Sequence, residues 1–445
     1  MQRMPARAAL AVAATVLLAA PQAMAQEGPK IDTGDTAWML TSTALVLMMT
    51  IPGLALFYAG MVRKKNVLAT MMQSFAITAL VTVVWMVAGY SLAFGEGNAW
   101  VGDLSRLFLN GLGETWDKPF TLGSGDAAVA TTLPETVFVM FQMTFAIITP
   151  ALITGAFADR MRFSALVLFN ILWSLLIYSP IAHWVWHPNG WIFALGALDF
   201  AGGTVVHINA GVAGLVCAVV LGKRVGYGND NMAPYNLSLA VIGAALLWVG
   251  WVGFNAGSAA AAGARAGMAM LVTQLAAAAA ALAWMFAEWA TKGKPSVLGA
   301  ISGAVAGLVA ITPASGFVLP GPALLIGMVA GLSGFWGATA LKHLCGYDDS
   351  LDAFGVHGIC GIVGSLMLGF LAYGPLSATT AVPDGSPGNL EQFIKQAYAT
   401  AAVFAYSAIG TFILLKVTDV VVGLRVPEEE EREGLDVTQH GERIA

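Results

Sequence analysis

The chain has 445 residues, of which 58% are hydrophobic and 11% charged, and its formal net charge is −5. Soluble globular proteins carry about a quarter charged residues, so this composition excludes a soluble enzyme and a disordered scaffold. Its 21 Lys and Arg residues are spread along the whole chain, which argues against a nucleic-acid-binding surface.

The first 25 residues have the pattern of an export signal. Arg3 and Arg7 supply a positive start, residues 8–20 are apolar, and Ala23-Met24-Ala25 fits the small-residue site at which such signals are cut. This apolar stretch is shorter than the ~20 residues that a spanning helix needs. We expect residues 1–25 to be a signal peptide; a retained twelfth helix is the alternative.

Residues 26–424 form the predicted transmembrane domain, in which long apolar stretches alternate with short polar breaks. Each stretch is long enough to span a bilayer as a helix, which satisfies its own backbone hydrogen bonds in lipid. In the eighth stretch Pro313 and Gly316 predict a shorter or bent element. The eleven predicted transmembrane helices cover about 38–61, 67–94, 135–158, 163–186, 200–222, 235–258, 266–289, 296–318, 320–341, 353–374 and 396–422.

The basic residues between the helices predict their orientation, because Lys and Arg concentrate in cytoplasmic loops. The mature N-terminus is then periplasmic and the tail, residues 425–445, is cytoplasmic, which places the protein in the cell inner membrane. An odd number of helices agrees with this orientation. The predicted cytoplasmic breaks carry Arg63, Lys64, Lys65, Arg160, Arg162, Lys223, Arg224, Lys292, Lys294 and Lys342, against Lys30, Arg106, Lys118, Arg265 and Lys395 on the other side.

Two segments of the chain resemble each other at an offset of 150 residues. DFAGGTVVHINAGVAG begins at Asp199 and DSLDAFGVHGICGIVG at Asp349, and in both the Asp lies eight residues before a His. Five helices separate the copies, so the copies face opposite ways across the membrane. The predicted fold is therefore an all-α membrane protein with an inverted five-helix repeat, and its site is expected near the midplane.

His207 and His357 are the two of the six histidines that lie well inside predicted helices. Each is ~12 Å of helical rise from the membrane surface where its Asp lies, and the two surfaces are opposite. Polar residues at the bilayer centre are costly, so the pair is a functional candidate; a buried structural role is the alternative. Neither helix has another ionisable residue at that depth, so the pair suits a neutral permeant.

No cofactor, metal site or enzyme activity is expected. The three cysteines form no cluster with histidines, and no nucleophile with an adjacent base or phosphate-binding loop is present.

Aromatic residues gather near the predicted outer surface. Phe141 and Phe145 share one helix face, as do Phe254 and Ser258, and core packing is the ordinary interpretation of both pairs. Asp199 precedes two glycines, so its carboxylate is placed either to cap the fifth helix or to stabilise a cation outside the pore.

The sequence resembles bacterial ammonium transporters of the Amt/Mep/Rh family. The resemblance follows chain order and covers nearly all of the mature sequence. It rests on PGLALFYAGMVRKKNVL from Pro52, FQMTFAIITPALI from Phe141, ADRMRFSALVLF from Ala158, DFAGGTVVHINAG from Asp199, GWVGFNAGSA from Gly250, DAFGVHGICG from Asp352 and GLRVPEEEEREGLD from Gly423.

The resemblance implies a homotrimer with a central hydrophobic pore in each subunit. His207 and His357 would line that pore, and Phe145 and Phe254 would close its outer mouth as a gate. Ammonium, or its analogue methylammonium, would lose its proton outside the gate and cross as ammonia. A cytoplasmic PII signalling protein is the expected partner.

An outer ammonium site is also implied, built from Trp186, Ser258 and Phe145 and supported by Asp199. One departure lies beside it: His187-Pro188-Asn189-Gly190 follows Trp186, where the family commonly has a glycine run in a shorter loop. Two other functions stay open, an Rh-type conduit for another small neutral molecule and an ammonium sensor that signals through cytoplasmic partners.

Overall fold

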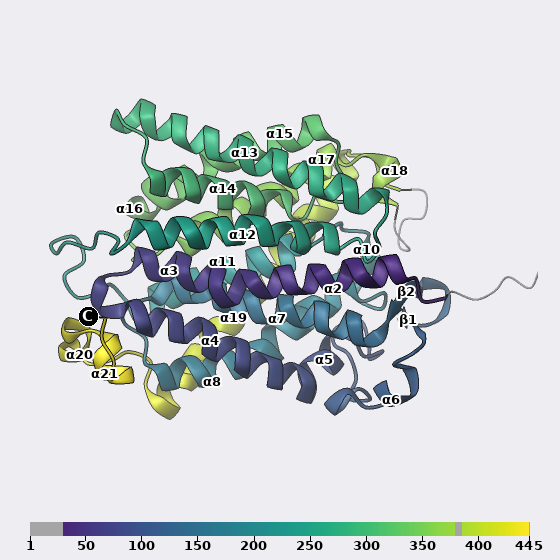
Figure 1. Cartoon of the computed structure of the whole chain (residues 1–445), viewed down its shortest axis with the longest axis horizontal. Helices are drawn as coiled ribbons and strands as arrows, with labels where there is room; N and C mark the ends of the chain where they lie inside the picture. Colours follow the sequence, from purple (N-terminus) through teal and green to yellow (C-terminus); the bar gives the residue numbers. More distant parts are fainter. Residues whose placement is uncertain (1–29, 379–384, 445) are drawn as a thin grey trace, which may run out of the picture.

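The structure is a computed structural model that describes residues 30–378 and 385–444; the predicted signal peptide, residues 1–25, lies outside them. The described chain is a bundle of helices that run side by side, with loops at both ends (Figure 1). The hairpin β1–β2 lies at one end and the C-terminal segment at the other. We call these the outer end and the inner end, after the predicted orientation.

The bundle has eleven apolar helical spans among the described residues, ten of them long enough to cross a membrane and one shorter. This agrees with the predicted number. The spans consist of α2 (Thr33–Met48) with α3 (Ala55–Met61), α4 (Val67–Val84) with α5 (Tyr90–Phe94), α7 (Glu135–Phe157), α8 (Phe163–Trp173) with α9 (Ser179–Trp186) and α10 (Trp191–Leu195), α11 (Asn209–Leu221), α12 (Leu237–Gly257), α13 (Ala264–Lys292), α14 (Val297–Ile311), α15 (Pro320–Trp336) with α16 (Lys342–Cys345), α17 (Cys360–Leu371) and α19 (Leu390–Val422).

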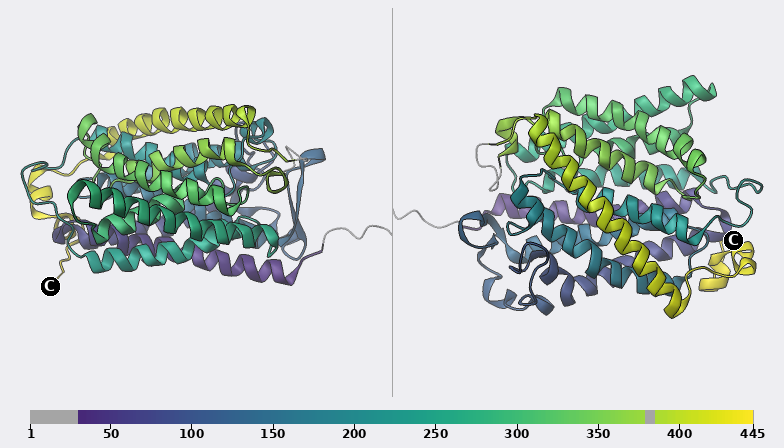
Figure 2. Two further views of the ribbon diagram at one scale, coloured as in Figure 1. Left: turned by 90° about the horizontal axis from the view of Figure 1, so that it is seen from above. Right: turned by 180° about the vertical axis from the view of Figure 1, so that it is seen from behind.

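Short π-helical segments continue several of these spans, and the last and longest helix, α19, runs obliquely across the back of the bundle (Figure 2). The segments with a role below are η7 (Gly203–Ile208), which leads into α11, and η9 (Phe354–Ile359), which leads into α17. The remaining α-helices and strands are α6 (Leu112–Thr115), α18 (Gly374–Ser377), α20 (Glu428–Glu433), α21 (Leu435–His440), β1 (Pro119–Leu122) and β2 (Val129–Pro134).

The eighth span is short, as its Pro313 and Gly316 predict. The helix α14 ends at Ile311, and residues 312–318 continue without helix. The carbonyl of Pro313 accepts a hydrogen bond from the amide of Phe200 (3.1 Å), so this turn packs against the chain that enters η7. The first and last helices begin earlier than expected, because Asp32 and Asn389 cap their first turns.

The outer loop between α5 and α7 holds structure that the hydropathy pattern does not predict. Strands β1 and β2 pair antiparallel, with Thr121 opposite Ala130. At the end of this loop the buried Glu135 accepts hydrogen bonds from Tyr90 (2.9 Å), Thr115 (2.9 Å) and Arg106. These bonds fix the loop over the outer end of the bundle.

The inverted repeat is visible in reciprocal contacts between its two copies. A Cβ atom added to Gly211 would lie 2.2 Å from the amide nitrogen of Gly358. At the positions 150 residues away, a Cβ atom on Gly361 would lie 3.2 Å from the amide nitrogen of Ile208. Asp199 and Asp349 likewise each accept backbone hydrogen bonds at the start of η7 and η9. The two copies therefore cross at closely matched positions.

The C-terminal segment packs on the inner end of the bundle (Figure 1). A β-bridge pairs Met161 with Arg425, and the Lys65 ammonium donates to the carbonyl of Glu431 (2.8 Å) at the end of α20. In turn the Asp436 carboxylate accepts from the amide of Ala69 (2.7 Å) in the first turn of α4. The segment is thus tied to the loops by side chains from both partners.

Candidate functional site

An outer cavity of about 150 Å³ brings together three of the residues proposed for ammonium binding, Phe145, Trp186 and Ser258. Trp186 is the last residue of α9, and its indole donates to the carbonyl of Asp199 (3.1 Å). The Ser258 hydroxyl donates to the carbonyl of Phe254 (2.8 Å), so its oxygen keeps lone pairs for a ligand. The remaining walls are Met39, Phe94, Leu122, Phe138, Phe141, Gln142, Phe200, Gly257 and Ala260.

Asp199, the fourth proposed residue, does not line this cavity. Its carboxylate accepts from the amides of Gly202 (2.8 Å), Gly203 (2.6 Å) and Thr204 (2.8 Å), and so caps η7. Burial raises the pKa of this carboxyl, and the hydrogen bonds from Thr204 and the two glycines oppose that rise. Of the two roles predicted for the Asp199 carboxylate, the geometry matches the helix cap. The backbone carbonyl of Asp199 accepts the hydrogen bond from the Trp186 indole.

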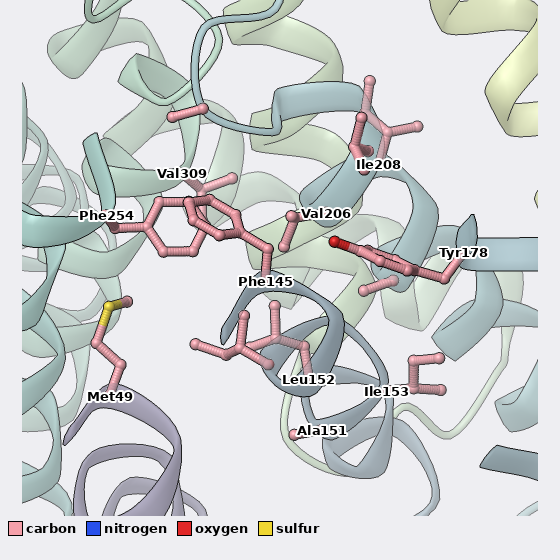
Figure 3. Close-up of a cluster of buried hydrophobic side chains, with 14 of the residues drawn as sticks. Met49, Phe145, Ala151, Leu152, Ile153, Tyr178, Val206, Ile208, Phe254 and Val309 are labelled. Atoms are coloured by element: carbon pink, nitrogen blue, oxygen red, sulfur yellow. The ribbon is translucent and has the colours of Figure 1, made fainter. Parts of the chain in front are cut away.

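Phe145 lines the outer cavity and Phe254 lines the next cavity inward, and the two rings pack together between them. Their ring centroids are 4.3 Å apart at an interplanar angle of 40°, and the two side chains meet in Figure 3. The Trp186 ring stands edge-on to Phe145, with centroids 5.6 Å apart. Both side chains are buried, and in this conformation their contact separates the outer cavity from the cavity beyond it.

A second cavity, of about 10 Å³, lies beyond the phenylalanine pair and is lined by His207 and His357. A water molecule needs about this much space or more, so the passage is almost closed. All other walls are apolar or aromatic: Met49, Leu54, Phe57, Ile148, Leu152, Leu247, Trp251, Phe254 and Val305.

The two imidazoles face each other as the repeat predicts. Their Nδ1 atoms are 3.4 Å apart, and the rings lie 15° from parallel. In such a contact one Nδ1 donates and the other accepts. The Nε2 atom of His207 is buried and has no partner among the described residues. This leaves a polar atom beside the narrow cavity for a hydrogen bond with a permeant.

Two residues of the pathway were not predicted from the sequence. Trp251 stacks on His207 with centroids 5.4 Å apart, and its indole donates to Thr312 (2.9 Å). It lies three residues before Phe254 on α12, so the helix-face rule that linked Phe254 to Ser258 also identifies it. Gln142 lines the outer cavity, and its Oε1 is buried without a partner in the described chain; a polar residue in an apolar helix was its signal.

Buried charge pairs hold the inner end of the bundle. Arg224 bonds Asp348 (2.8 Å), and Arg63 bonds Asp159 (3.0 Å). Asp349, the residue after Asp348, caps η9, and burial raises the pKa of its carboxyl to about 6. Within residues 30–378 and 385–444, no group of three His, Cys, Asp or Glu residues could hold a metal ion.

An aromatic outer cavity, a closed phenylalanine pair and a narrow apolar cavity with two histidines, set in a bundle of membrane-length helices, define a membrane transport protein for a very small solute. The model of the Ammonium Transporter Family matches residues 37–444. The chain belongs to that family, and it is a transmembrane transporter of ammonium.

Relatives and solved structures agree with this assignment. The chain is 50% identical to an ammonium transporter of Bacillus subtilis, over 92% of this chain and 98% of that protein. It is 48% identical to an ammonium transporter of Aquifex aeolicus, over 93% and 94%. The crystal structure of Candida albicans Mep2 superposes with a TM-score of 0.80 at 34% identity, over 90% of this chain and 88% of that one. A sensor Amt protein superposes with a TM-score of 0.82 at 28% identity, over 92% and 98%.

Proposed function

We propose that ammonium binds in the outer cavity, transfers its proton to water on the outer side, and crosses the narrow cavity as ammonia. The observation that supports this route is the order of the compartments. The wide polar-edged cavity holds Trp186 and Ser258, the pair Phe145–Phe254 follows, and an apolar cavity with two imidazoles lies beyond it.

Recognition of the cation is assigned to aromatic faces and oxygen atoms. An ammonium ion over the ring of Trp186 or Phe145 gains ~0.5–2 kcal/mol from the ring quadrupole. The Ser258 oxygen and the unpartnered Oε1 of Gln142 accept its N–H groups. Asp199 contributes through its carbonyl, which holds the Trp186 indole, rather than by touching the ion.

Selectivity follows from the dry cavity beyond the phenylalanines. A cation that enters an apolar space of about 10 Å³ must leave its water behind, and no carboxylate of the described residues lines that space. An unpaired charge in such surroundings costs many kcal/mol. Ammonium escapes this cost by releasing a proton, whereas potassium has none to release. His207 and His357 then offer hydrogen bonds to neutral ammonia.

The assembly and setting of the protein are part of the same proposal. We infer a homotrimer in the cell inner membrane, with residues 1–25 removed as a signal peptide, the mature N-terminus periplasmic and the tail, residues 425–445, cytoplasmic. The basic residues of the loops and the family resemblance support this arrangement. A PII signalling protein is the proposed partner at the inner end, where the tail is packed.

A sensor role is the second candidate, because the chain covers 98% of a solved sensor Amt protein at 28% identity. In that role the signal would pass to a partner bound at the inner end, where the tail packs. Transport and sensing are separable, since a sensor alone needs no flux.

Flux through the purified protein in proteoliposomes tests the proposal. We expect methylammonium uptake that saturates with concentration and ammonium flux into the vesicles, with potassium excluded. Empty vesicles are the control, and vesicles with the His207→Ala/His357→Ala variant should admit potassium. Carbon dioxide flux without methylammonium flux would identify an Rh-type conduit instead, and ammonium binding without any flux would identify a sensor.

A further inference from the structure

The turn after Trp186, whose His187–Gly190 sequence departs from the family pattern, belongs to a row of hydrogen bonds with the outer loop. Side chains and amides of residues 183–191 donate to carbonyl groups of residues 93–100. The Trp184 indole donates to the carbonyl of Trp100 (2.6 Å), and the Asn189 side-chain amide donates to that of Glu96 (2.9 Å). The backbone amide of Trp191 donates to the carbonyl of Ala99 (3.2 Å).

His183 makes two contacts in this row. Its Nδ1 is 3.0 Å from the carbonyl oxygen of Ala93, and its Nε2 is 2.6 Å from that of Asn98. A carbonyl oxygen only accepts hydrogen bonds, so each contact requires a proton on the ring nitrogen. A neutral imidazole has one N–H, whereas an imidazolium has two. The side chain is fully buried, so water does not replace either contact.

Burial opposes a positive charge on His183, and two acidic groups of the outer loop offset part of that cost. Asp103 and Glu96, both in the outer loop, are the acidic groups that act on it. Hydrogen bonds from Ser105 hold the pKa of Asp103 below its usual range, so that carboxyl is ionised. The basic neighbour is His187, whose ring is stacked at 4.6 Å. Its Nδ1 accepts from the amide of Asn189 (3.1 Å), which matches a neutral ring.

We propose that His183 is a doubly protonated positioning residue that sets the width of the outer ammonium site. Its two bonds tie α9 to the end of α5 and the loop beyond it. His183 lies three residues before Trp186, and its acceptor Ala93 immediately precedes Phe94; both Trp186 and Phe94 line the outer cavity. One imidazolium therefore ties together two neighbouring elements that each supply a wall of that cavity, and this inference rests on the proposed function of the site.

The charge of His183 is measured directly by solid-state NMR of the unsubstituted protein in bilayers at pH 8, with ¹⁵N-labelled histidine. The chain has six histidines. At that pH a histidine with the ordinary pKa is only about 3% charged. We expect one ring with two protonated nitrogens, and its signals disappear in His183→Gln. A spectrum with neutral rings alone would overturn the proposal, whether or not the variant folds.

The positioning role is measured by methylammonium uptake. His183→Gln keeps one hydrogen bond and loses the charge, so we expect KM to rise about threefold or more while the maximal rate changes less than twofold. His343→Gln, at the exposed inner end, is the matched control and keeps both parameters. An unchanged KM in His183→Gln would refute positioning. Absent uptake by the unsubstituted protein would instead refute the proposed function, and the NMR result would still stand.

Discussion

Gly211 and Gly361, at equivalent positions of the repeat, each lie against the backbone of the other copy with little room for a side chain. The space is tighter at Gly211, where a Cβ atom would meet the backbone nitrogen of Gly358 at 2.2 Å, against 3.2 Å to Ile208 at Gly361. The crossing that sets the two histidines face to face therefore depends on these glycines.

Gly211→Ala is expected to destabilise the protein by about 1–3 kcal/mol, because backbone must move to accommodate the methyl group. Gly361→Ala should cost less, since its nearest atom belongs to a side chain, Ile208, at 3.0 Å. Thermal unfolding in detergent measures both effects. Gly321→Ala, with open space around its Cβ position, is the control. Equal melting temperatures for all three variants would contradict the tight crossing.

Replacing His207 or His357 by Ala should leave the protein folded and change ion selectivity. The substitution widens the narrow cavity and removes its hydrogen-bonding atoms, so water and potassium gain access. Currents across planar bilayers with ammonium and then potassium measure the change, with His343→Ala as the control. Selectivity that stays the same in both variants would remove the central role proposed for the pair.

Trp186→Leu should weaken saturation by methylammonium. The lost cation–π contact of ~0.5–1 kcal/mol corresponds to a KM about two- to fivefold higher. Trp116→Leu, on the exposed outer loop, is the control because that ring is 61% exposed. If the concentration dependence of uptake is the same in both variants, the Trp186 ring is not the cation platform.

The stability of the protein should fall as the pH rises from 4 to 6, because the buried Asp349 loses its proton in this range. Its folded-state pKa of about 6 lies above its pKa in the unfolded chain. The contribution of Asp349 to the free energy of unfolding is therefore complete below the unfolded-state pKa and is lost as the pH rises through 6. A shift of this size corresponds to ~3 kcal/mol. Melting curves of the unsubstituted protein and of Asp349→Asn should converge at low pH. Parallel pH profiles would show that this carboxyl is not the responsible group.

Deleting residues 428–445 should leave the pore formed and disturb regulation. The deletion removes the contacts of Lys65 with Glu431 and of Asp436 with Ala69, so the inner loops lose their covering. Methylammonium flux reports on the pore, and a pull-down with a purified PII protein reports on the partner. Retained PII binding by the truncated protein would contradict a contribution of the tail.

The sequence is sufficient to predict the number of spans, the short eighth helix and the meeting of His207 with His357. The length of the apolar stretches predicts the spans, because a helix must cross the lipid. The offset of 150 residues predicts the meeting of the histidines, because it reveals the symmetry of the repeat. Phe145 and Phe254 also meet as the resemblance implies, although their role as a gate stays a prediction.

Other features depend on contacts between distant segments, which hydropathy does not encode. The β1–β2 hairpin lies in a polar loop, and the docking of α20 and α21 needs partners such as Lys65 and Asn66 far away in the chain. Gln142 and Trp251 sit among apolar neighbours, so their orientation toward the pathway appears only with the packed helices.

The closed ring pair at the outer mouth has a bioenergetic consequence. With Phe145 and Phe254 in contact above a space of about 10 Å³, this conformation of the protein has no room for a continuous file of water along which a proton could hop. In the cell inner membrane that we propose for this protein, many copies would then lie in an energised bilayer without short-circuiting its proton gradient.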